Sequence, residues 1–148
     1  MPGKAREAVR FTSRRPDAGR RNPYVDAGWW PRSGELANEL EQLVHAAVQV
    51  GVCVSRVTYR LDDGWTVPVR TVLVDGREIK LSGYHNHRRN MIRLIDGAAH
   101  KQLEVMVVPP DTKPVVAELA LRLAAAHTDP SHGTDILRLA REISPAVR

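Results

Sequence analysis

The 148-residue chain has few of the residues that carry recognisable chemistry or a special architecture. Cys53 is its only cysteine, so an internal disulfide bond is excluded. No apolar run approaches the roughly 18 residues that would span a bilayer, and no apolar stretch follows the basic N-terminus as it would in a secretory signal. These features predict a cytoplasmic protein with no membrane partner.

Catalytic and cofactor motifs are also missing. The sequence contains no Gly-x-Ser-x-Gly elbow and no phosphate loop, while Asp62-Asp63 is typical of a hairpin turn and Asp111 of a helix cap. His85 and His87 could share one face of an extended segment, but two nitrogens are too few for a typical zinc site. We therefore expect no catalytic residue, no metal and no cofactor, and we lean against an enzyme.

Positive charge is concentrated at the N-terminus. Residues 1–23 contain seven Lys and Arg against two Asp and Glu, a net charge of +5 that equals the net charge of the whole chain. The segment has little apolar surface, and termini are poorly ordered unless tied down. It predicts a flexible basic arm over 1–23 and a single α+β domain over 24–148. The alternative is that Val9–Thr12 adds to the sheet as an edge strand.

Apolar spacing predicts the elements of this domain. A helical period over Leu36–Val48 predicts a first helix, with Ser33 as its N-cap and Gly51 ending it. The period then changes to two, which predicts strands over 53–61, 67–74, 78–83, 91–95 and 102–108. Asp75-Gly76 predicts a tight hairpin. Pro109-Pro110 ends the sheet, and two helices follow over about 113–126 and 134–142.

This order, one helix, five strands and two helices, predicts an α+β fold: an antiparallel meander of about five strands with the helices packed on one face. Strand parity separates the two faces of the sheet. The core face is predicted to hold Ile79, Leu81, Leu103, Val105 and Val107. The other face is predicted to be solvated and to hold Glu78, Lys80, Ser82, Arg93, Gln102 and Glu104.

Three segments carry a resemblance to a known family. They are residues 24–33, which contain Trp-Trp-Pro-Arg-Ser; residues 56–59 with Trp65; and residues 107–112, which contain Pro-Pro-Asp-Thr. Together they resemble an actinobacterial domain family of unknown function, over about residues 24–126. The resemblance implies an actinobacterial host. It brings no activity, cofactor or catalytic residue.

The adjacent Trp29 and Trp30 are the leading candidate site, together with Arg32. Neighbouring side chains in an extended segment point to opposite sides, so one ring is expected under the first helix and the other partly exposed beside Arg32. Exposed tryptophans are frequent binding anchors. The leading hypothesis is a non-catalytic binding or regulatory module for a protein or small ligand. The alternative for this motif is a structural corner with both rings buried.

A second hypothesis is weak nucleic-acid binding, which is possible but not favoured. It would use the basic arm and a basic loop, through Arg14, Arg15, Arg20, Arg21, Arg88 and Arg89. No aromatic-studded strand or helix-turn-helix accompanies these residues. A disordered arm and a solvated loop are the preferred explanation for these residues.

Overall fold

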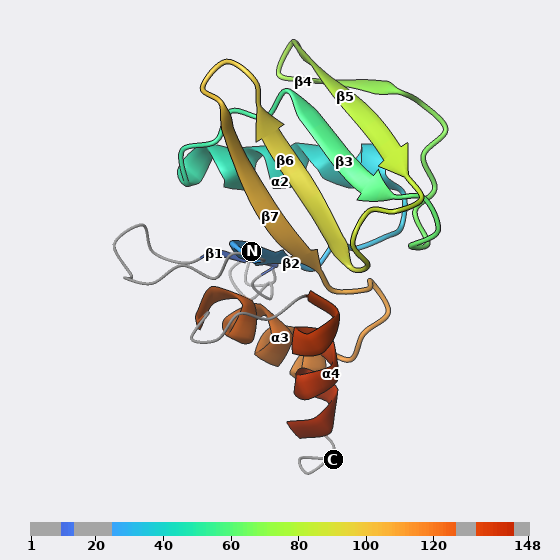
Figure 1. The fold of residues 1–148 in the computed structure, drawn as a ribbon, viewed down its shortest axis with the longest axis vertical. Coiled ribbons are helices and arrows are strands. Elements are labelled where there is room, and N and C mark those ends of the chain that lie inside the picture. Colours follow the sequence, from blue (N-terminus) through green and yellow to red (C-terminus); the bar gives the residue numbers. More distant parts are fainter. Residues whose placement is uncertain (1–9, 14–24, 127–132, 144–148) are drawn as a thin grey trace, which may run out of the picture.

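A seven-stranded mixed sheet and three helices make up the part of the protein that the computed structural model describes, residues 10–13, 25–126 and 133–143 (Figure 1). In chain order the elements are β1 (Phe11–Ser13), β2 (Ala27–Trp29), α2 (Leu36–Gln49), β3 (Arg56–Arg60), β4 (Thr71–Val74), β5 (Arg77–Tyr84), β6 (Met91–Asp96), β7 (Lys101–Val107), α3 (Pro114–Ala126) and α4 (Gly133–Ile143). The predicted α+β class is confirmed.

The predicted antiparallel meander of five strands is wrong. The strand order is β1-β2-β7-β6-β3-β5-β4, with β2 parallel to β7 and β3 parallel to β5. Of the strand expected over 67–74, only Thr71–Val74 joins the sheet, because Pro68 lacks a backbone N–H for the ladder. The connection from Leu61 to Arg70 is too long for a tight hairpin. It carries the chain to the sheet edge, and β5 then returns beside β3.

Two strands were not among the five expected. β1 pairs antiparallel with β2, which places Phe11 opposite Trp29. The edge-strand alternative for the start of the chain is therefore realised at Phe11–Ser13, while most of the predicted arm lies outside the described residues. β2 contains the first tryptophan of the Trp-Trp motif and lies parallel to β7.

The prediction that all the helices pack on one face of the sheet is wrong. In Figure 1, α2 lies behind the sheet, whereas α3 and α4 lie at the end where β1 and β2 are found. Gly28 on β2 allows α3 to come close, because a Cβ there would lie 3.0 Å from Cβ of Ala124 and 3.1 Å from Cδ2 of Leu121. A larger residue at this position would push the helix away.

Other local predictions are confirmed or shifted slightly. Gly51 has a φ of 87° and follows α2 in a Schellman arrangement, in which the Val52 N–H donates to the Ala47 carbonyl at 3.0 Å. Asp75 and Gly76 both have positive φ, 53° and 79°, as a type I′ hairpin requires. Ser33 is not the N-cap of α2; Glu35 takes that position without a side-chain cap.

Candidate ligand-binding surface

Trp29 and Trp30 lie on opposite faces of the sheet, as their parity predicts. The Trp29 ring is 2% exposed in the core under α2, where it stacks on Trp65 with ring centroids 5.9 Å apart. The Trp30 ring is 6% exposed in the second core, beneath α3 and α4. Its Nε1–H donates to the Pro110 carbonyl at 3.3 Å, and the Arg10 guanidinium lies 4.2 Å from its ring centroid.

The expectation of one partly exposed ring beside Arg32 is wrong, because both indoles are buried. Arg32 turns instead to α2, where its backbone N–H donates to Glu39 at 3.0 Å and its guanidinium donates to Gln42 at 2.8 Å. The cation over the Trp30 ring comes from Arg10, which the sequence spacing does not suggest. The double tryptophan therefore joins two cores and offers no exposed indole.

A hollow of about 380 Å³ lies beside the contact partners of these two tryptophans, Trp65 and Pro110. It is lined by Gly34, Asp63, Gly64, Trp65, Asn90, Val107, Pro109, Pro110 and Asp111. The pKa of the Asp63 carboxyl is raised by burial, although the Asn90 N–H donates to that carboxylate at 2.7 Å. Aromatic and proline walls with two carboxyl groups suit a cationic ligand that has an apolar part.

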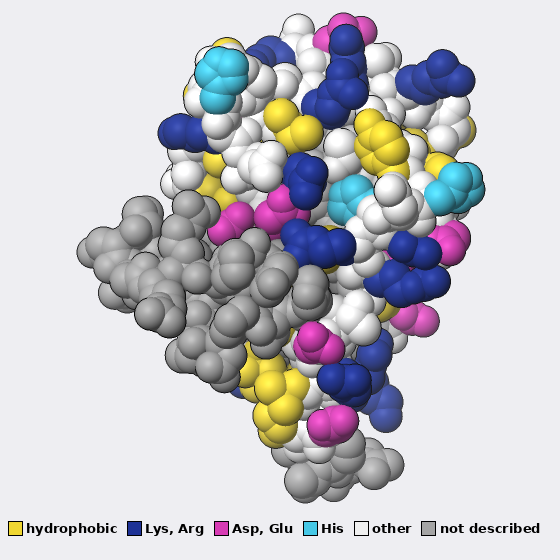
Figure 2. Space-filling view, viewed as in Figure 1, with side chains coloured by type: hydrophobic (Ala, Val, Ile, Leu, Met, Phe, Trp, Pro, Cys, Tyr) yellow, Lys and Arg dark blue, Asp and Glu magenta, His cyan; other side chains and the backbone are white. Residues whose placement is uncertain are grey.

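The predicted polar face of the sheet is present and lies opposite α2. Ile79, Leu81, Val105 and Val107 are buried in the core under α2, so the alternate residues of β3, β5, β6 and β7 face away from it. Figure 2 views this face and shows Lys and Arg side chains spread across it. The middle of the sheet therefore presents charged and polar groups on this face.

One buried carboxylate organises two arginines on this face. Glu104, which is 7% exposed, accepts from Arg88 Nη2 at 2.8 Å and from Arg93 Nε at 2.7 Å. Arg93 lies directly opposite Glu104 in the β6–β7 ladder, whereas Arg88 reaches it from the loop after β5. A carboxylate removed from water needs such partners, and in return it fixes the direction of both guanidinium groups.

The loop over 85–90 is fastened across the sheet by further contacts. Nε2 of His87 lies 3.0 Å from the Thr58 hydroxyl on β3. Arg60 donates from Nη1 to the His87 carbonyl at 2.7 Å and also binds Asp62. The hydrogen bond from Arg60 holds the pKa of the Asp62 carboxyl below its usual range. The loop is thus held as one wall above the sheet.

Between this loop and the strands lies a hollow of about 460 Å³, called here the basic hollow. It is lined by Arg56, Thr58, Tyr84, Asn86, His87, Arg88, Arg93 and Ile95. No Asp or Glu is among these lining residues, and Arg56 makes a 3.2 Å hydrogen bond to the Ser82 hydroxyl. An open site of this composition can accept an anion.

The sequence-predicted residues divide between these places. Arg88 lines the basic hollow, while Arg89 is exposed and lies 3.8 Å from Asp62. Arg14, Arg15, Arg20 and Arg21 lie outside the described residues. Sequence reasoning placed Arg93 on the polar face but missed Arg56, Thr58 and Tyr84 as its neighbours. Strand parity assigns each of these residues to the polar face of its own strand. Which of them are neighbours depends on the order of the strands in the sheet, which the sequence did not predict.

No helix in the described part of the chain is both long and apolar enough for a membrane span.

The comparisons with known proteins fix the family. No curated protein and no solved structure matches the chain. A family of unknown function, DUF5994, matches residues 10–124, from just before β1 into α3. Because this match covers more than half of the sequence, the chain belongs to DUF5994, a family of unknown function.

Proposed function

We propose that this protein is a ligand-binding module and that the basic hollow binds a small phosphorylated molecule. The observation that carries the proposal is that three arginines, Arg56, Arg88 and Arg93, line one hollow whose described lining residues include no Asp or Glu. Guanidinium groups match the geometry of phosphate oxygens and can bind them in pairs.

The preorganised arginines of this site favour a ligand-binding role over a merely solvated surface. Glu104 already holds Arg88 and Arg93, so little side-chain entropy remains to be lost when an anion binds. The volume of about 460 Å³ lies within the usual range for small-molecule sites. The exposed ring of Tyr84 and the side chain of Ile95 add an apolar wall for an organic group.

Calorimetric titration with pyrophosphate and with a nucleoside monophosphate tests the proposal. Arg56→Gln is the cleanest variant, because the described partner of Arg56 is only the neutral Ser82 hydroxyl. We expect it to weaken binding about tenfold or more, the usual scale for a hydrogen bond to a charged group. The matched control, Arg122→Gln, changes an exposed arginine on α3 and should bind as the wild type does.

The same titration distinguishes nucleic-acid binding from binding of a small phosphorylated ligand. A single-stranded oligonucleotide that binds far more tightly than the mononucleotide, with a steep loss of affinity as salt rises, would favour the nucleic-acid hypothesis. Equal affinity per phosphate group and a shallow salt dependence would favour the small ligand.

A second candidate ligand site is the hollow beside Trp65. The hollow beside Trp65 has two carboxyl groups, from Asp63 and Asp111, and would take a cation with an apolar part. Trp65 is the least buried of the three indoles, so quenching of tryptophan fluorescence by an alkylammonium ligand, lost in Trp65→Leu, would favour this candidate.

A further inference from the structure

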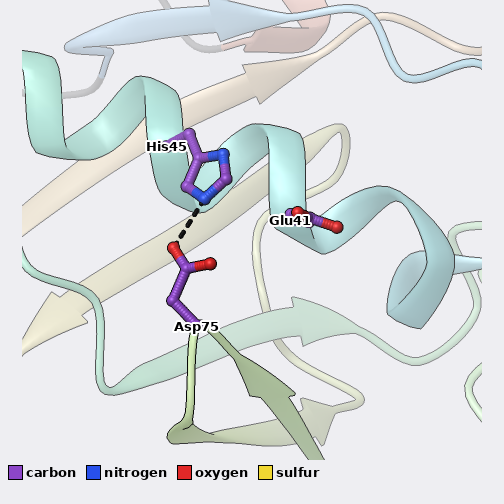
Figure 3. A group of neighbouring side chains, drawn as sticks. All are labelled: Glu41, His45 and Asp75. Atoms are coloured by element: carbon purple, nitrogen blue, oxygen red, sulfur yellow. Dashed lines mark hydrogen bonds and ion pairs between the residues drawn. The ribbon is translucent and has the colours of Figure 1, made fainter.

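A group of three potential metal ligands lies on the side of the sheet away from the basic hollow. Glu41 and His45 are on α2, and Asp75 is in the turn between β4 and β5 (Figure 3). One donor atom from each residue lies within 4.8 Å of the other two. Nε2 of His45 is already 2.8 Å from Oδ2 of Asp75.

The fold itself brings these donors together. A separation of four residues places Glu41 and His45 on the same side of α2, one turn apart. Asp75 is held by the type I′ turn, where its φ is 53°, and the preceding Val74 is buried at the contact between β4 and α2. In Figure 3 the His45 ring points from the helix toward the Asp75 carboxylate.

The donor set has the chemistry of a transition-metal site. One imidazole nitrogen and two carboxylates suit zinc, and three protein ligands leave a fourth position for water. Within the described residues, no Lys or Arg forms an ion pair with Glu41 or Asp75, so their negative charge is available to a cation. The side chains of His45 and Asp75 are 50% and 67% exposed, so a metal ion can reach them from solvent.

We infer that Glu41, His45 and Asp75 form a surface site for one divalent transition-metal ion, with zinc as the favoured occupant. In the metal-bound form, Nε2 of the neutral His45 ring binds the ion in place of its proton, and the ring carries its single N–H proton at Nδ1 instead. Glu41 completes the set by a rotation of its exposed side chain. This site is independent of the phosphate site proposed above.

Calorimetric titration of the tag-free full chain with zinc chloride, after treatment with a chelator, tests the inference. We expect one zinc ion per chain and a loss of affinity of tenfold or more in each of His45→Ala, Glu41→Gln and Asp75→Asn. Asn tolerates the left-handed backbone at position 75, so that variant keeps the turn. The control His100→Asn changes a different exposed histidine, whose positive φ Asn also tolerates. Its zinc affinity should stay within twofold of the wild type.

Either of two results overturns the inference. One is no zinc uptake by the wild type, and the other is an affinity of His45→Ala within twofold of the wild type. Melting temperatures measured without metal identify any variant that fails to fold. If His45→Ala is such a variant, Glu41→Gln and Asp75→Asn decide in the same way.

Discussion

Arg93 and Glu104 face each other across the β6–β7 ladder, and Nε of Arg93 lies 2.7 Å from a carboxylate oxygen of Glu104. The second carboxylate oxygen binds Arg88 from the loop after β5. One buried acid thus couples the loop to the sheet and sets two of the arginines around the basic hollow.

Replacing Glu104 with Gln should destabilise the protein by about 2 kcal/mol. This value lies between the small worth of exposed ion pairs and the larger cost of breaking buried ones, because both arginines are partly exposed. Urea unfolding measures the loss. The control Glu118→Gln, at an exposed position of α3, should change the unfolding free energy by less than about 0.5 kcal/mol. Equal stabilities of the two variants would contradict the coupling role of Glu104.

Trp29→Ala and Trp30→Ala should each destabilise the protein by about 3–5 kcal/mol, because each removes a buried indole from a separate core. Denaturant unfolding of the two single variants checks this expectation. Val115→Ala, at an exposed position of α3, is the control and should cost far less. A cost near 1 kcal/mol for either tryptophan, typical of a surface position, would show that its ring is not core.

The short strand β1 should contribute to stability. Its Thr12 hydroxyl donates to the Leu121 carbonyl at 2.6 Å, and the Trp30 N–H donates to the Arg10 carbonyl at 2.8 Å. A chain that starts at residue 14 should therefore be less stable than one that starts at residue 10, by about 2 kcal/mol or more, since it loses several hydrogen bonds and cover over Trp30. Equal melting of the two truncated chains would mean that β1 adds nothing.

Asp96 should contribute to stability at neutral pH and lose that contribution in acid. Its carboxylate accepts from the backbone N–H groups of Cys53 at 3.0 Å and Ala99 at 3.1 Å, and these bonds lower its pKa. A lowered folded-state pKa means that the contribution is complete above the unfolded pKa of about 3.9 and fades as pH falls below it. Unfolding of wild type and Asp96→Asn at several pH values should show their difference shrinking from about pH 5 toward pH 3. A difference that stays constant would contradict this.

Local patterns predicted the elements well and their arrangement poorly. The positions of α2, the hairpin at Asp75-Gly76 and the buried parity of Ile79 and Leu81 follow from periodicity and turn chemistry. The parallel pairing of β3 with β5 does not, because nothing local says where the chain returns after the connection that contains Pro68. That pairing places Thr58, which lines the basic hollow, beside Ser82, the hydrogen-bond partner of Arg56.

The tryptophan motif shows the same limit. Parity correctly separated the two rings, but exposure depends on what covers them. The cover over Trp29 comes from α2 and Trp65, and that over Trp30 comes from Arg10 and the C-terminal helices. Likewise, Asp75 meets His45 only through the packing of β4 against α2. Contacts between such distant segments are set by tertiary structure.

The most direct test of the proposed phosphate site is amide chemical-shift mapping during titration with a nucleoside monophosphate. A ligand bound in the basic hollow should produce saturable shifts at the residues that line it, including Arg56, Thr58 and His87, with little change around Gly34 and Trp65. The same titration of Arg56→Gln should require about tenfold more ligand. Shifts confined to other surfaces, or no saturable shift at the lining residues, would contradict phosphate binding in the basic hollow.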